Sequence, residues 1–110
     1  MARVDKHGSI YVVRPEGPLR ADTIESIHTL VSTKLTGGVP AIVVDFSDTP
    51  LLDSLGLEWL LDLVGECCRR GGCVRLCNVG ELCDDLLRIT GVGSSIESFP
   101  DLTSALGSFA

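Results

Sequence analysis

This sequence lacks the features that identify nucleic-acid-binding, membrane-spanning and secreted proteins. It has no basic cluster longer than Arg69-Arg70, and its formal net charge of −6 argues against binding to nucleic acid or to an anionic membrane surface. It has no apolar stretch long enough to span a bilayer, and its first residues do not resemble a signal peptide. We therefore expect a cytoplasmic protein that neither binds nucleic acid nor inserts into a membrane.

Residues that commonly carry out catalysis are also scarce. A nucleophilic serine needs a base within hydrogen-bond reach, and the chain has only two histidines, His7 and His28. It has no Gly-x-Ser-x-Gly motif. The segment Gly91-Val92-Gly93 follows a predicted helix instead of starting one, so it is typical of a helix end and not of a phosphate-binding loop. We expect a protein that is not an enzyme and has no cofactor.

The cysteines do not have the pattern of a disulfide framework or of a zinc site. Their number is odd, and cysteines in the cytoplasm stay reduced. Cys73 and Cys77 have a zinc-like spacing, but on a strand they would stand roughly 13 Å apart, too far for one ion. We therefore expect no metal, and redox control through Cys67-Cys68 stays open as an alternative. Small buried apolar residues are the favoured interpretation of Cys67, Cys68, Cys73, Cys77 and Cys83.

The chain has the length and composition of one packed domain, which we expect to cover residues 1–110. It has 110 residues, of which 45% are hydrophobic and 22% charged. Apolar runs predict strands over residues 8–15, 42–46, 73–79 and 95–99. Capping residues and helical periodicity predict helices that begin near Asp22, Ser54, Gly80 and Pro100. This alternation predicts an α/β fold with a mostly parallel, four- to five-stranded sheet covered by about four helices.

Helical spacing also predicts which side of each helix is buried. In the first helix, with Asp22 as its N-cap and Gly37-Gly38 as its end, the apolar stripe consists of Ile24, Ile27, Leu30, Val31 and Leu35. In the second it consists of Leu57, Leu60, Leu61, Val64 and Cys68. In the third it consists of Leu82, Leu86 and Ile89.

The second stripe predicts that Trp59 and Leu63 lie on the outer face of their helix. This face also carries Glu58, Asp62 and Glu66 at four-residue spacing. A tryptophan among acidic residues is typical of a protein-binding surface, since tryptophan is enriched at interface hot spots. The alternative is that Trp59 packs across a neighbouring helix.

The segment Asp53-Ser54-Leu55-Gly56-Leu57 is the most informative part of the chain, because it joins a predicted strand to a predicted helix. The start of a helix presents free N–H groups and the positive end of the helix dipole. A phosphate on Ser54 would be stabilised there by roughly 0.3–2 kcal/mol and would add about −1.5 to −2 charges. The simpler interpretation is that Asp53 and Ser54 only cap the helix.

Several segments together resemble the STAS domain, the fold of bacterial anti-sigma factor antagonists. They are the strand at residues 42–46, the segment at residues 53–57, the Gly71-Gly72 turn before a strand, and Leu86-Leu87-Arg88-Ile89-Thr90-Gly91-Val92. The resemblance implies that Ser54 accepts a phosphate. It further implies that the unphosphorylated protein binds an anti-sigma serine kinase, that phosphorylation releases it, and that a serine phosphatase restores binding.

On this basis we expect a switch in which Ser54 is phosphorylated and neighbouring residues contact the kinase. The chain departs from the family at Leu55, where a small residue is usual, and at Arg20, where an aspartate is usual. Leu55 either crowds the kinase or adds an apolar contact, and Arg20 can pair with a phosphate. We expect a monomer or weak dimer. The partner-binding residues predicted are Asp53, Gly56, Leu57, Glu58, Trp59, Asp62, Leu63, Leu19, Arg20 and Asp22.

Two alternatives remain. One keeps the fold without the switch, as a constitutive STAS scaffold in a signalling complex or in a lipid or anion transporter. The other is a thiol-based redox sensor.

Overall fold

The computed structural model describes residues 2–34 and 38–109, which form a single compact α/β domain. Its five strands lie in the order β1 (Ala2–His7), β2 (Ile10–Pro15), β3 (Ala41–Asp45), β4 (Cys73–Cys77) and β5 (Glu97–Phe99). Only the β1–β2 pair is antiparallel, and the other pairs are parallel. The predicted fold class, mostly parallel sheet and strand number are therefore confirmed.

The edge strand β1 was not predicted. It pairs with β2 through a hairpin whose turn uses Gly8 in the left-handed region, with φ of 64°. Only Ala2 and Val4 of β1 pack against the core, and the other residues of the strand are charged or polar and exposed. An edge strand exposed in this way carries almost no apolar alternation, so the sequence gives no signal for it.

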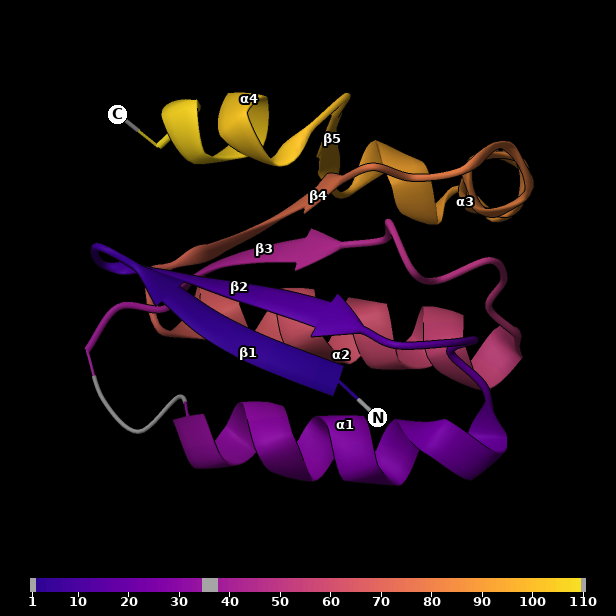
Figure 1. Cartoon of the computed structure of the whole chain (residues 1–110), viewed down its shortest axis with the longest axis horizontal. Coiled ribbons are helices and arrows are strands. Elements are labelled where there is room, and N and C mark those ends of the chain that lie inside the picture. Colours follow the sequence, from indigo (N-terminus) through magenta and orange to yellow (C-terminus); the bar gives the residue numbers. More distant parts are fainter. Residues whose placement is uncertain (1, 35–37, 110) are drawn as a thin grey trace.

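The helices cover both faces of the sheet (Figure 1). Helices α1 (Ala21–Lys34) and α2 (Ser54–Arg69) lie side by side on one face. Helix α4 (Leu102–Gly107) lies on the other face over β3, β4 and β5. Helix α3 (Glu81–Thr90) follows β4 along the chain and leads through a short 3₁₀ turn, Val92–Ser94, to β5.

Two apolar cores follow from this layering. The larger lies between the sheet and α1 and α2, and the smaller joins Val12, Val43 and Cys77 of the sheet to Ala105 of α4. Leu35 and Gly37, predicted near the end of α1, lie outside the described residues. Gly38 adopts a φ of 70°, which glycine tolerates after a helix.

The predicted buried stripe of α2 is correct in part. Leu60 is buried, and Leu57 and Val64 are half-buried and pack against the larger core. The other buried residues of the helix are Gly56, Trp59, Leu63 and Cys67. Trp59 is only 5% exposed, whereas Leu61 is 43% exposed and Cys68 is exposed. The helix carries two apolar stripes, offset by one residue, of nearly equal regularity. Packing against α1 selects the stripe that contains Trp59, so the alternative reading of this residue is the correct one.

Helix α3 shows the same offset. Its buried residues are Cys83 and Leu87. The predicted inward residues Leu82 and Ile89 are 53% and 78% exposed, and Leu86 is half-buried. The core therefore takes the less apolar of two adjacent stripes and leaves the more apolar one at the surface.

A buried carboxylate ties three strands together where β3 ends. Asp45, which is 1% exposed, accepts hydrogen bonds at Oδ2 from Nε (3.1 Å) and Nη2 (3.0 Å) of Arg14 on β2. Its Oδ1 accepts from the Ser47 N–H (2.9 Å) and from Nδ2 of Asn78 (3.1 Å). Burial by itself would raise the pKa of Asp45. The hydrogen bonds from Ser47, Asn78 and Arg14 outweigh burial, so that its pKa lies below the ordinary value.

We predict that Asp45→Ala lowers the free energy of unfolding by about 2–4 kcal/mol, because it leaves Arg14 and Asn78 without their acceptor. The exposed Asp48→Ala is the matched control and should change it by less than about 0.5 kcal/mol. Folding lowers the pKa of Asp45. The Asp45 carboxylate therefore stabilises the folded protein fully at pH values above its pKa in the unfolded chain, and this stabilisation is lost as the pH falls through its pKa in the folded protein. Urea unfolding at several pH values measures both effects, and equal midpoints for the two variants would contradict the prediction.

Candidate functional site

The Asp53 side chain caps two helices at once. Its Oδ1 accepts from the Gly56 N–H (3.0 Å) as the N-cap of α2, and its Oδ2 accepts from the Ala21 N–H (3.2 Å), the first residue of α1. These hydrogen bonds, the one from Gly56 first, hold the pKa of Asp53 below its ordinary value. The two helix N-termini therefore converge on one carboxylate.

The backbone on either side of this carboxylate is equally constrained. Leu19 forms an isolated parallel bridge with Leu52, and its carbonyl accepts from the Asp53 N–H (3.0 Å). A Cβ at Gly56 would lie 2.5 Å from the Leu19 carbonyl oxygen, so this position requires glycine. The segment before α1 and the first turn of α2 are thus packed backbone against backbone.

Ser54 is the first residue of α2 and its side chain is exposed. Asp53 caps α2, as the simpler interpretation of this segment predicted. The structure describes no hydrogen bond from the Ser54 hydroxyl. A phosphate there would lie at the start of α2 and beside the Asp53 carboxylate. The site therefore combines an accessible hydroxyl with a backbone fixed by its neighbours.

The start of α1 differs from the prediction. The helix begins at Ala21, and the Thr23 and Ile24 N–H groups donate to the Arg20 carbonyl (both 2.9 Å). Thr23 Oγ1 accepts from the Arg20 N–H (3.0 Å), and the capping contact predicted for Asp22 is made by Asp53, which accepts from the Ala21 N–H. Asp22 lies in the first turn and pairs with Arg20 (Nε to Oδ1, 3.3 Å). Both side chains are exposed next to the Asp53 cap.

The structure divides the predicted partner-binding residues into two groups. Arg20, Asp22, Glu58 and Asp62 are exposed, and Asp53 and Leu57 are half-buried. Leu19, Gly56, Trp59 and Leu63 are buried, and of these Trp59 and Leu63 line a groove between α1 and α2. The exposed Leu55 adds an apolar side chain next to Ser54 that was not in the predicted set.

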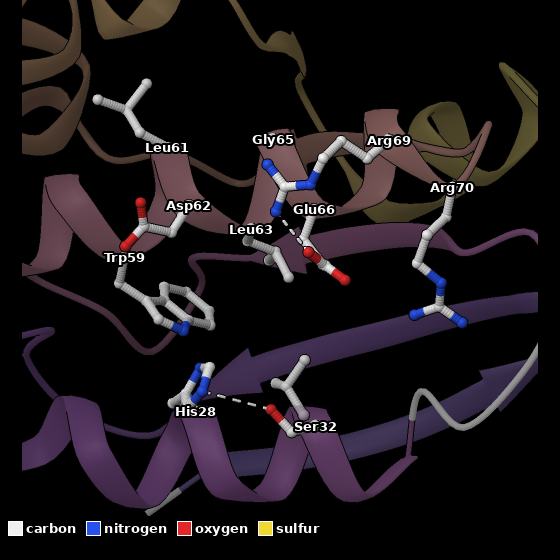
Figure 2. A pocket seen from close by; sticks show the side chains of 11 residues that line it. His28, Ser32, Trp59, Leu61, Asp62, Leu63, Gly65, Glu66, Arg69 and Arg70 are labelled. Carbon is white, nitrogen blue, oxygen red and sulfur yellow. Dashed lines mark hydrogen bonds and ion pairs between the residues drawn. The ribbon is translucent and has the colours of Figure 1, made fainter.

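A groove of about 600 Å³ runs between α1 and α2 (Figure 2). Val31, Trp59 and Leu63, all buried, form its floor, and the Trp59 indole points toward His28 of α1. His28 and Ser32 lie on the α1 side, with 3.5 Å between His28 Nε2 and Ser32 Oγ. The sequence did not identify His28 and Ser32 as groove residues, because only the packing of α1 against α2 brings them opposite Trp59.

The cysteines fit the predicted buried role in part. Cys67, Cys77 and Cys83 are buried, Cys73 is half-buried and Cys68 is exposed. Burial raises the pKa of the Cys67 thiol to about 11 and that of Cys77 to about 12. A high thiol pKa means little thiolate at neutral pH, so the buried cysteines lack the reactivity of a redox sensor.

Within residues 2–34 and 38–109, no three His, Cys, Asp or Glu side chains lie close enough together to hold a metal ion. In the same part of the chain, no helix has the length and apolarity needed to cross a membrane.

Comparison with known proteins gives a family and several structural neighbours. A model of the STAS domain matches residues 1–105. A search of curated proteins finds no match. An anti-sigma factor antagonist from Mycobacterium paratuberculosis superposes with a TM-score of 0.87 at 22% identity, covering 98% of this chain and 92% of that one. At these identities the likeness shows the fold alone.

Two further structures extend the comparison. The phosphorylated form of the Bacillus cell fate determinant SpoIIAA has a TM-score of 0.76 at 20% identity, and the match covers 100% of both chains. The murine anion transporter Slc26a9 has a TM-score of 0.70 at 18% identity, covering 93% of this chain but only 18% of the transporter.

We predict that Gly56→Ala destabilises the protein by about 1–3 kcal/mol, because its Cβ collides with the Leu19 backbone. Gly65→Ala is the matched control within the same helix. A Cβ there would meet only Arg69 Nη1 at 3.6 Å, an ordinary contact. We expect Gly65→Ala to stabilise the protein by about 0.5–1 kcal/mol, since alanine favours a helix interior. Thermal or urea unfolding measures both, and a loss of stability in both variants would contradict the assignment.

We also predict that one thiol reacts quickly with Ellman's reagent in the native protein. Cys68 is exposed, whereas Cys67, Cys77 and Cys83 are buried with raised pKa values. Cys68→Ser should remove the fast phase, and denaturant should make all thiols react. A fast phase that survives in Cys68→Ser would show that a second thiol is accessible.

Proposed function

The chain belongs to the STAS domain family, and we propose that it is a reversible protein-interaction switch of the anti-sigma factor antagonist type. In this proposal the unphosphorylated chain binds an anti-sigma serine kinase, phosphorylation of Ser54 releases it, and a serine phosphatase restores binding. The family match and the fold of the antagonist structures support this choice. The protein has no catalytic role of its own in the proposal.

The observation that carries the proposal is the position of Ser54. Its side chain is exposed at the first residue of α2, while Asp53 and Gly56 hold the surrounding backbone against Leu19 and Ala21. A kinase can reach the hydroxyl without unfolding the helix start. The added phosphate would change the charge of the surface and leave the frame beneath it in place.

The surrounding surface suggests how a phosphate would release the partner. Leu55 is exposed next to Ser54, and Glu58 and Asp62 continue along α2. A partner that covers Leu55 would have to remove water from a phosphate that carries about −1.5 to −2 charges, at a large cost in desolvation. The proposed contact surface consists of Arg20, Asp22, Ser54, Leu55, Glu58 and Asp62, and it fits a partner with an apolar centre and a basic rim.

The second candidate is a constitutive STAS scaffold without a switch. The likeness to the STAS region of an anion transporter favours it, as does Leu55 at a position where a small residue is usual in the antagonists. In this case Ser54 and Asp53 serve only the start of α2. Phosphorylation of Ser54 separates the two candidates.

We predict that Ser54→Asp captures at least about tenfold less of a kinase-like partner from the source cell than wild type or Ser54→Ala does, because the new carboxylate lies inside the interface. Ser95→Asp is the matched control, since Ser95 is also exposed but lies beyond α3. Incubation of the chain with cell extract and ATP should place a phosphate on Ser54, detected by mass spectrometry. Equal capture by all four proteins, without phosphate on Ser54, would favour the scaffold.

A further inference from the structure

We propose that the groove between α1 and α2 binds a small amphipathic carboxylate, an anion with an apolar body and an oxygen atom at its far end. The groove, of about 600 Å³, has the size of a ligand pocket. Trp59 and His28 lie at one end and Arg70 lies at the other (Figure 2). Arg70 follows Trp59 by eleven residues, which is roughly 16 Å along a helix.

The indole N–H of Trp59 is a hydrogen-bond donor that opens into the groove. Trp59 is 5% exposed, and no hydrogen bond from its N–H is described. Yet among the described residues, no buried side-chain nitrogen or oxygen lacks a hydrogen-bond partner, so this N–H is not sealed inside the protein. The indole nitrogen lies on the edge that faces His28 (Figure 2). A donor placed there favours a ligand that brings an oxygen acceptor to this end.

The guanidinium of Arg70 favours an anion at the other end. Arg70 is half-buried, and no ion pair within residues 2–34 and 38–109 includes it. Its Nη2 donates to the Gly38 carbonyl at 3.4 Å, which is a long hydrogen bond. The adjacent Arg69 differs, because Glu66 pairs with it. A carboxylate at Arg70 would form charge-assisted hydrogen bonds that are partly shielded from water.

The middle of the groove is apolar. Val31 and Leu63, both buried, form its floor, and the exposed Leu61 extends the apolar surface on the α2 side. A chain of methylene groups laid over these side chains would remove water from them, which favours binding. An extended chain of about ten carbons fits the separation between Trp59 and Arg70.

The acidic residues beside the groove orient such a ligand. Arg69 neutralises Glu66, whereas no ion pair of Asp62 is described. Asp62 precedes Arg70 by eight residues, or roughly 12 Å along the helix, which is more than a Debye length at physiological ionic strength. Asp62 therefore opposes an anion near Trp59 much more than one at Arg70. A hydroxyl group suits the Trp59 end, since its oxygen can accept from the indole and its O–H can donate to a carboxylate.

This binding site is independent of the proposed switch. Arg70 follows Ser54 by sixteen residues, which places it roughly 24 Å along α2 from the start of the helix. A failure to bind the carboxylate would therefore leave the proposed function of Ser54 unaffected.

The test is a fluorescence titration of the full chain with ω-hydroxydecanoate. Trp59 is the only tryptophan, so a change in its emission reports directly on the groove. We expect a saturable change with a dissociation constant between about 10 μM and 1 mM. Acetate, which has the head group alone, and decyltrimethylammonium, which has the opposite charge, should bind at least about tenfold more weakly. Decanoate should also bind more weakly, because it brings no acceptor to the indole N–H.

Variants test the role of Arg70. Arg70→Gln should weaken binding of ω-hydroxydecanoate at least about tenfold. Arg3→Gln is the matched control, since it removes the same charge from an exposed site on β1 outside the groove, and it should bind as wild type does. Circular dichroism verifies that both variants fold.

Several results would overturn the proposal. They are a wild type without a saturable response up to about 1 mM, unchanged binding by Arg70→Gln, and binding of decanoate or of the cation that equals that of ω-hydroxydecanoate. A chain that sediments as a dimer and binds none of these molecules would assign the groove to a second copy, which also contradicts it.

Discussion

The carboxylate of Asp53 is the interaction on which the arrangement of this surface depends. It accepts from the N–H groups of Gly56 and Ala21, and so joins the starts of α2 and α1, which come from distant parts of the chain. Gly56 makes this possible, because any side chain there would collide with the Leu19 carbonyl. The exposed Ser54 lies between these two constraints. Its position in space is therefore set by Asp53 and Gly56 and does not depend on contacts of its own side chain.

The loop that leads to Ser54 is anchored at its other end as well. Asp45 joins β2, β3 and β4 through Arg14, Ser47 and Asn78. Between the two aspartates, the buried Thr49 donates from Oγ1 to the Pro15 carbonyl (3.2 Å). The segment between β3 and α2 is thus fixed at both ends and in its middle. On such a frame the proposed switch acts through the charge and hydration of one side chain, with no need for the backbone to move.

Helices α2 and α3 show where sequence patterns reach their limit. Each carries two apolar stripes that are offset by one residue, and helical periodicity alone does not rank them. In α2 the neighbouring α1 decides, because it buries Trp59 and Leu63 and leaves Leu61 exposed. In α3 the core accepts Cys83 and Leu87, and the larger side chains Leu82 and Ile89 remain outside.

The sequence by itself determined the α/β class, the order of the helices and strands after the first hairpin, and the position of Ser54 at the start of a helix. Each of these follows from local signals: apolar runs, glycine turns and a capping aspartate that act within a few residues. Only the tertiary structure decided that Asp53 and not Asp22 caps α1, and that Trp59 is buried. The first feature depends on a contact between residues more than thirty positions apart, and the second on the choice between two faces of a helix. Local pattern contains no information about either, because burial is set by the neighbouring element and not by the spacing of the residues themselves.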